Sequence, residues 1–184
     1  MKRRSFLNSS AIALGALSSG LGARTKDAPK FAARPARVTS IGFHPGMSLD
    51  AIAALVDQEG AHGADLIALP ETCRGLNGQS GEDVDGPTVR AVAELARKHR
   101  TYIVCPIDRR TEGQRHNSAI LLDRAGKVAT IYDKIYPVWQ GECVLDPPVH
   151  PGEAVRVYET DFGRVGLAIC FDVNWAPLWQ KLSD

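Results

Sequence analysis

Residues 65–71 read DLIALPE, a short apolar stretch that ends on a proline and a carboxylate. An apolar run of this length, bounded by polar residues, predicts a buried β-strand. Before it, Ser48 is the expected N-cap of an amphipathic helix that runs to about His62. After it, a loop rich in glycine and acids leads to Pro87, which suits the first position of a second amphipathic helix. The stretch therefore predicts a strand set between two helices.

The predicted elements along the rest of the chain extend this pattern. Strands are expected at residues 37–43, 65–69, 102–106, 118–122, 127–132, 155–160 and 165–170. Turn sequences at 123–126 and 161–164 join the last four strands into two hairpins. Residues 134–154, which hold four prolines, are expected to form a long loop, and a helix is expected at 175–182. The first five elements have the order βαβαβ, which favours an α/β layer architecture over a β-barrel or a helix bundle.

The first 30 residues differ from the remainder in charge. They hold six of the 22 lysines and arginines and one of the 21 acidic residues, so residues 31–184 carry a net charge of −4. This acidic balance argues against a nucleic-acid partner, which needs a basic face. Arg3 and Arg4, followed by Ser-Phe-Leu and a short apolar stretch, resemble a bacterial twin-arginine export signal.

We therefore expect two regions, a signal peptide with its linker at residues 1–30 and a folded domain at residues 36–184. The apolar stretch at 11–17 is too short for a stable membrane span. No stable span is expected after signal cleavage, and the protein is expected to be periplasmic or extracellular. An ordinary secretory signal and a disordered basic tail are the alternatives for the first 30 residues.

Three reactive side chains each follow an apolar stretch. Glu71 follows LIALP, Lys134 follows ATIYD, and Cys170 follows GLAI. A thiol becomes a strong nucleophile when a base or a cation lies beside it, and a carboxylate and an amine fill these roles. Taken singly, Cys170 is more typical of a packed core, and Glu71 and Lys134 are more typical of a solvated surface. Their shared position at strand ends, which gather at one edge of a parallel sheet, favours a thiol hydrolase.

The other three cysteines raise two possibilities, a zinc site and a disulfide. The chain has no C-x-x-C pair, so a zinc site is not expected. A disulfide among Cys73, Cys105 and Cys143 is compatible with an exported protein, whereas a nucleophilic Cys170 has to stay a thiol.

The sequence around these residues resembles a known family. LPE at 69–71, YDK at 132–134 and ICFD at 169–172 resemble the three signature blocks of the nitrilase, or carbon–nitrogen hydrolase, superfamily. Two supporting blocks, PGE at 151–153 and TDFGRVG at 160–166, also match. The resemblance covers about residues 36–184.

The resemblance implies a four-layer αββα sandwich and hydrolysis of a non-peptide C–N bond without a metal or a cofactor. The substrate class is a small amide or carbamoyl amine, and less favourably a nitrile. Cys170 is the implied nucleophile and Glu71 the general base. Lys134 and the backbone N–H of Phe171 are implied to stabilise the oxyanion.

Further residues are implied in substrate binding. Glu142 occupies the place of a second glutamate that positions substrate in the family, although an exposed loop acid is the alternative. Directly after the lysine, many family members have other residues where this chain has Ile135-Tyr136-Pro137. Tyr136 and Trp139 either line the acyl pocket or pack the loop.

Family domains continue well beyond the cysteine block, whereas this chain ends at Asp184. We therefore expect it to represent the N-terminal part of the family domain, incomplete at the C-terminus, and to form a homodimer if the full length is present. Two alternatives to a hydrolase stay open. One is an inactive remnant that only binds a ligand or partner, and the other is an acyltransferase of the same superfamily that forms amides.

Overall fold

The computed structural model describes residues 35–44, 46–75, 81–140, 143–144 and 149–183. The predicted signal peptide at residues 1–30 and the predicted substrate-positioning Glu142 lie outside the described residues. No helix in this described part of the chain is long and apolar enough to cross a membrane.

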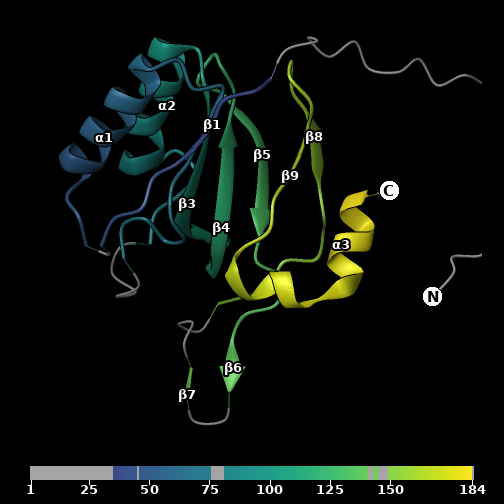
Figure 1. The fold of residues 1–184 in the computed structure, drawn as a ribbon. Helices are drawn as coiled ribbons and strands as arrows, with labels where there is room; N and C mark the ends of the chain where they lie inside the picture. Colours follow the sequence, from purple (N-terminus) through teal and green to yellow (C-terminus); the bar gives the residue numbers. More distant parts are fainter. Residues whose placement is uncertain (1–34, 45, 76–80, 141–142, 145–148, 184) are drawn as a thin grey trace, which may run out of the picture. The chain divides into compact units, whose positions relative to one another are not determined.

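Five strands form the central sheet, in the order β1-β2-β3-β4-β5 (Figure 1). They are β1 (Val38–Ser40), β2 (Leu66–Ala68), β3 (Tyr102–Thr111), β4 (Gln114–Leu122) and β5 (Val128–Asp133). β1, β2 and β3 are parallel to one another, whereas β4 is antiparallel to β3 and β5 is antiparallel to β4. β5 therefore runs in the same direction as β2, and both strands end at the same edge of the sheet.

Two helices, α1 (Leu49–Ala61) and α2 (Pro87–His99), cover one face of this sheet (Figure 1). Both predicted helix starts are confirmed. The Ser48 hydroxyl accepts a hydrogen bond from the Ala51 N–H at 3.2 Å, and Pro87 lies in the first turn of α2. The core beneath the helices is built of buried aliphatic side chains from the helices and the sheet, among them Ile52, Val56, Ile67, Val92, Ile103 and Ile120.

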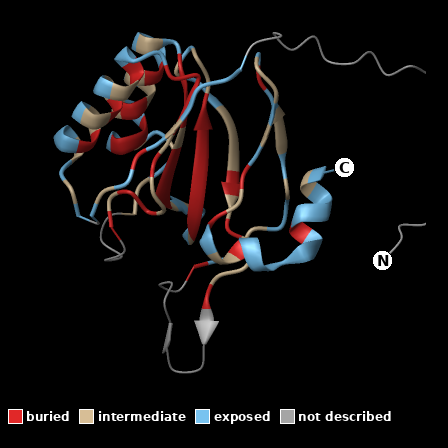
Figure 2. Ribbon diagram, viewed as in Figure 1, coloured by how far each residue is buried: buried red, intermediate tan, exposed pale blue. Residues whose placement is uncertain are grey.

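The opposite face of the sheet is covered by residues that follow β7 (Cys143–Val144). β8 (Val157–Glu159) and β9 (Arg164–Gly166) form an antiparallel pair. Leu167 and Ile169, which follow β9, are buried in one cluster with Leu121 and Tyr132 of the sheet. The chain then continues into α3 (Ala176–Ser183), which is mostly exposed, whereas β3 and β4 are largely buried (Figure 2).

The sequence prediction missed one hairpin. β3 continues to Thr111, well past the predicted end at residue 106, and turns at residues 112–113 into β4. The polar residues of this hairpin hid its strands, because they break the apolar pattern from which a strand is predicted. Asp108 pairs with Arg115, and Arg109 pairs with Asp133, so these charges neutralise one another within the sheet.

Two further predictions are corrected. The predicted loop at 134–154 contains two short strands, β6 (Trp139–Gln140) and β7 (Cys143–Val144), which pair with each other. The strand predicted to reach Cys170 ends at Gly166, and a 3-10 helix occupies Cys170–Asn174. The carboxylate of Asp172 accepts the Ile169 N–H at 3.0 Å, so this donor turns inward and does not continue the strand ladder.

Candidate active site

Glu71 and Lys134 meet at the sheet edge where β2 and β5 end. The Nζ atom of Lys134 lies 2.9 Å from Oε1 of Glu71. The lysine side chain is 1% exposed and the glutamate side chain is 28% exposed. A buried ammonium requires an anionic partner, because its desolvation is costly. The pair therefore presents a carboxylate to solvent from one side while a fixed positive charge holds it from the other.

Asn117 of β4 is a third member of this cluster, and the sequence prediction did not include it. Its side-chain amide donates from Nδ2 to the same Oε1 of Glu71 at 2.7 Å. Its backbone carbonyl accepts the N–H of Lys134 at 2.8 Å. Both donors thus contact one oxygen of Glu71, and Oε2 accepts no hydrogen bond from the described residues.

Gly152, in the PGE block, fixes the backbone around Lys134. Its N–H donates to the Lys134 carbonyl at 2.9 Å. A Cβ atom at this position would lie 2.1 Å from the carbonyl oxygen of Asp133. Only glycine fits against β5 at this point, which gives a physical reason for the residue at the centre of that block.

Cys170 lies at a sharp bend in the backbone. Ile169 is extended, with φ −120° and ψ 115°, whereas Cys170 has φ +46°, in the left-handed region. A non-glycine residue pays a steric penalty in this region, and such strain is common at functional sites. The bend leaves the side chain of Cys170 exposed as a thiol, directly after the buried Ile169.

Asp172 holds this bend in place. Its carboxylate is fully buried and accepts hydrogen bonds on both oxygens. Oδ2 accepts the Ile169 N–H at 3.0 Å and the Tyr132 hydroxyl at 2.7 Å, and Oδ1 accepts the Tyr136 N–H at 2.8 Å. Burial raises the pKa of the Tyr132 hydroxyl, and its hydrogen bond to Asp172 raises that pKa further. Asp172 therefore connects the cysteine bend to β5 and to the segment that follows Lys134.

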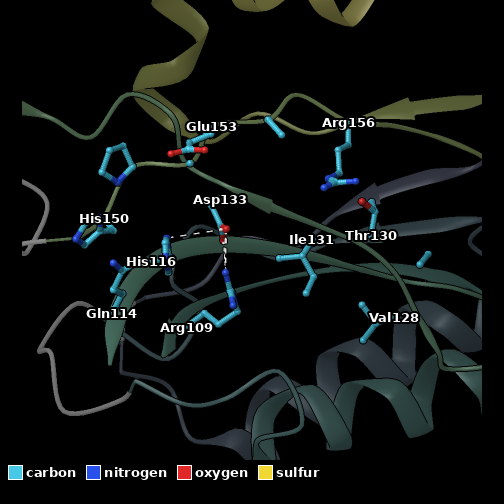
Figure 3. Close-up of a pocket in the computed structure, with 14 residues that line it drawn as sticks. Arg109, Gln114, His116, Val128, Thr130, Ile131, Asp133, His150, Glu153 and Arg156 are labelled. Carbon is cyan, nitrogen blue, oxygen red and sulfur yellow. Dashed lines mark hydrogen bonds and ion pairs between the residues drawn. The ribbon is translucent and has the colours of Figure 1, made fainter. Parts of the chain in front are cut away.

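Glu71 and Cys170 line the same cavity, which has a volume of about 460 Å³. Its walls are mainly apolar and come from β2, β3 and the segment at 165–169. A larger cavity of about 740 Å³ lies along β5 and the segment at 150–156 (Figure 3). The larger cavity is lined by none of the three predicted catalytic residues, so we assign the candidate active site to the smaller one.

The remaining predicted site residues have different positions. Phe171 is partly exposed in the 3-10 helix, next to Cys170. The Tyr136 ring stacks on Trp175, with ring centroids 4.5 Å apart and an interplanar angle of 16°. Tyr136 thus packs against the segment after the cysteine and does not line the cavity that holds Cys170. Trp139 lies in β6.

Two further cysteines are thiols as well. Cys73 and Cys105 are buried in the core beneath the helices. The hydrogen bond with Cys73, followed by burial, raises the pKa of the Cys105 thiol well above its ordinary value. Among the described residues, no three His, Cys, Asp or Glu side chains gather in the arrangement of a metal site.

Comparison with solved structures identifies the fold class. An amidase of the nitrilase superfamily from Nesterenkonia matches 79% of this chain and 59% of its own, with a TM-score of 0.64 and 19% identity. Nit3 of Saccharomyces cerevisiae, a member of branch 10 of that superfamily, matches 80% of this chain and 60% of its own, with a TM-score of 0.64 and 20% identity. The predicted α/β fold of the nitrilase type is therefore confirmed.

Sequence comparison identifies the family. The family model described as carbon-nitrogen hydrolase matches residues 46–184, so the chain belongs to the carbon–nitrogen hydrolase family. A deaminated glutathione amidase from Yersinia enterocolitica is 30% identical over 108 residues, which is 53% of this chain and 38% of the relative. A nitrilase from Paraburkholderia phymatum is 28% identical over 153 residues, which is 73% of this chain and 44% of the relative. The chain thus spans less than half the length of these curated relatives.

Proposed function

We propose that this protein hydrolyses small amides or carbamoyl amines through a thioester on Cys170. The observation that carries the proposal is the ion pair between Glu71 and the buried Lys134, together with the cavity that Glu71 shares with the exposed thiol of Cys170 at a strained bend. Family membership and the amidases among its relatives support this reaction class. Nitriles are the less favoured substrates.

The first half of the reaction forms the thioester. Glu71 takes the proton of the Cys170 thiol, and the sulfur attacks the carbonyl carbon of the substrate. The resulting oxyanion is stabilised by the Lys134 ammonium and by the Phe171 N–H. A single donor of this kind lowers the barrier by about 3 kcal/mol. Glu71 then returns its proton to the substrate nitrogen, the C–N bond breaks, and ammonia or an amine leaves.

The second half releases the acid. Glu71 takes a proton from water, and the hydroxide attacks the thioester carbon. The C–S bond breaks, and Glu71 returns the proton to the sulfur, which restores the thiol. Lys134 keeps its proton throughout, because its role is to stabilise charge on the carboxylate and on the oxyanion. An amine in place of water would give acyl transfer, which is the alternative reaction for the same residues.

Substrate positioning and location complete the proposal. Glu142 is assigned to position the substrate, on the sequence pattern alone. Tyr136 is assigned to shape the site through its stack on Trp175, and Trp139 stays a predicted pocket residue. Export by the twin-arginine route to the periplasm or beyond rests on the sequence of residues 1–30. A homodimer of the full-length protein also stays a prediction.

The experiment is a panel of simple amides, carbamoyl amines and nitriles, assayed for release of ammonia and of the acid. Cys170→Ala is expected to reduce turnover by at least about 10³-fold. Lys134→Met is expected to abolish turnover, whereas the control Lys127→Met, which changes an exposed lysine before β5, leaves it unchanged. Full turnover in Cys170→Ala would exclude the thioester mechanism. Accumulation of an amide product with added amine would favour acyl transfer, and ligand binding without any turnover would favour a binding protein.

A further inference from the structure

We propose that Asn117 is the positioning residue for Glu71, holding this carboxylate so that Oε1 stays bound and Oε2 faces the reacting groups. The inference rests on the proposed role of Glu71 as the general base. It adds a residue that none of the sequence blocks contains.

The contacts around Glu71 divide its two oxygens. Asn117 and Lys134 both donate to Oε1, at 2.7 Å and 2.9 Å. Asn117 is 3% exposed, whereas Glu71 reaches into the cavity that Cys170 also lines. With two buried donors on one oxygen, the side chain of Glu71 is held in one orientation. Oε2 is the oxygen left to exchange a proton with the thiol and with water.

Asn117 is itself held rigidly by its strand. It pairs with Asp108 of β3 in the ladder, and its carbonyl accepts the N–H of Lys134 at 2.8 Å. One residue thus fixes the carboxylate through its side chain and the start of the lysine segment through its backbone. A shift of Asn117 would change the relative positions of both groups.

The other side-chain atom of Asn117 gives a second, independent observation. Its Oδ1 is buried and accepts no hydrogen bond within the described residues. Buried polar atoms are nearly always hydrogen-bonded, so an unsatisfied one requires an explanation. Turning the amide over would place Oδ1 against the Glu71 carboxylate, where two acceptors repel each other. The orientation that donates to Glu71 is therefore the favourable one, although it leaves Oδ1 of Asn117 without a hydrogen bond within the described residues.

The chemical type of the residue also fits this role. An amide donates a hydrogen bond but has no proton to lose near neutral pH. It can therefore hold the carboxylate without giving it a proton, which would disable the base. A second lysine would add charge beside the Lys134 ammonium, which is already buried.

A double-mutant cycle tests the proposal, with the rate of Cys170 alkylation by iodoacetamide and the rate of amide turnover as readouts. Asn117→Leu and Asn117→Asp both remove the donor at similar volume, and Gln114→Leu is the control on an exposed position of β4. Each Asn117 variant is expected to slow both rates by about 10- to 100-fold with little change in KM, since misplacing a catalytic group has effects of this size. In a Glu71→Ala background the same substitutions are expected to change neither rate further.

The outcomes distinguish the positioning role of Asn117 from the proposed role of Glu71 as the general base. Wild-type rates in both folded Asn117 variants would overturn the positioning role while leaving Glu71 intact. Equal losses with and without Glu71 would assign Asn117 a purely structural role, which also overturns it. Wild-type alkylation and turnover in Glu71→Ala would instead refute the proposed function. Alkylation is measurable in a folded variant that has no turnover, and the near-ultraviolet circular dichroism of each variant shows whether it is folded.

Discussion

Replacing Asp172 by alanine removes a fully buried carboxylate that accepts hydrogen bonds from three parts of the chain. The donors are the Tyr132 hydroxyl on β5, the Ile169 N–H before the cysteine bend, and the Tyr136 N–H after Lys134. A hydrogen bond to a charged group contributes about 1.5–3 kcal/mol, and a buried donor left unpaired costs about 1–3 kcal/mol. These terms overlap, so we expect a loss of about 3–5 kcal/mol in the free energy of unfolding.

Urea unfolding followed by tryptophan fluorescence measures this loss. Asp172→Asn keeps the volume but offers one acceptor oxygen where two are used, so we expect about half the loss. The control is Asp50→Ala in the first turn of α1, an exposed acid whose removal costs at most about 1 kcal/mol through the helix dipole. If Asp172→Ala and Asp50→Ala lose similar amounts, the carboxylate does not hold the bend and our reasoning about Cys170 is refuted.

Two other predictions concern the residues that surround this site. Burial and the hydrogen bond to Asp172 raise the pKa of Tyr132 in the folded state. As the pH rises, Tyr132 therefore loses its proton first in the unfolded state. The contribution of Tyr132 to the free energy of unfolding is complete below about pH 10 and falls above it. Tyr132→Phe is expected to flatten this decline in urea unfolding between pH 8 and 11, and an unchanged slope would contradict the assignment. Gly152→Ala places a methyl group against the Asp133 carbonyl and is expected to cost about 1–3 kcal/mol together with most amide turnover. Gly42→Ala serves as its comparison, since that glycine, like Gly152, has no positive φ but has open space around it, and equal activity losses in the two variants would show that contact with β5 is unimportant.

The helices and the βαβαβ order were predictable because each depends on local signals. The Ser48 cap and Pro87 mark helix starts through local sequence alone, so these starts do not depend on which elements pack against the helices. The hairpin between β3 and β4 was not predictable in the same way, because its charged residues hide the apolar pattern and one of them, Arg109, finds its partner only once β5 lies alongside. Arg109 reaches Asp133, which is far from it in sequence and adjacent only in the folded sheet.

The candidate site likewise contains residues that were predictable from the sequence and one that was not. Glu71 and Lys134 were predicted together because each ends an apolar strand, and they do form a contact at 2.9 Å. Asn117 was missed because an asparagine inside a strand carries no signal of its own. Its contact with Glu71 depends on the strand order, which places only β3 between β2 and β4, and on the register that pairs β4 with β5. Registers of this kind are set by the whole sheet and not by the local sequence.

The thioester on Cys170 is the central claim, and trapping it is the most direct test. An amide substrate that is turned over would be mixed with the protein, quenched in acid within milliseconds to seconds, and the intact mass and cysteine peptides measured. We predict an acyl adduct on the peptide that contains Cys170, with Cys73 and Cys105 unmodified because both are buried. Turnover without any adduct, or an adduct and full activity in Cys170→Ala, would contradict the mechanism.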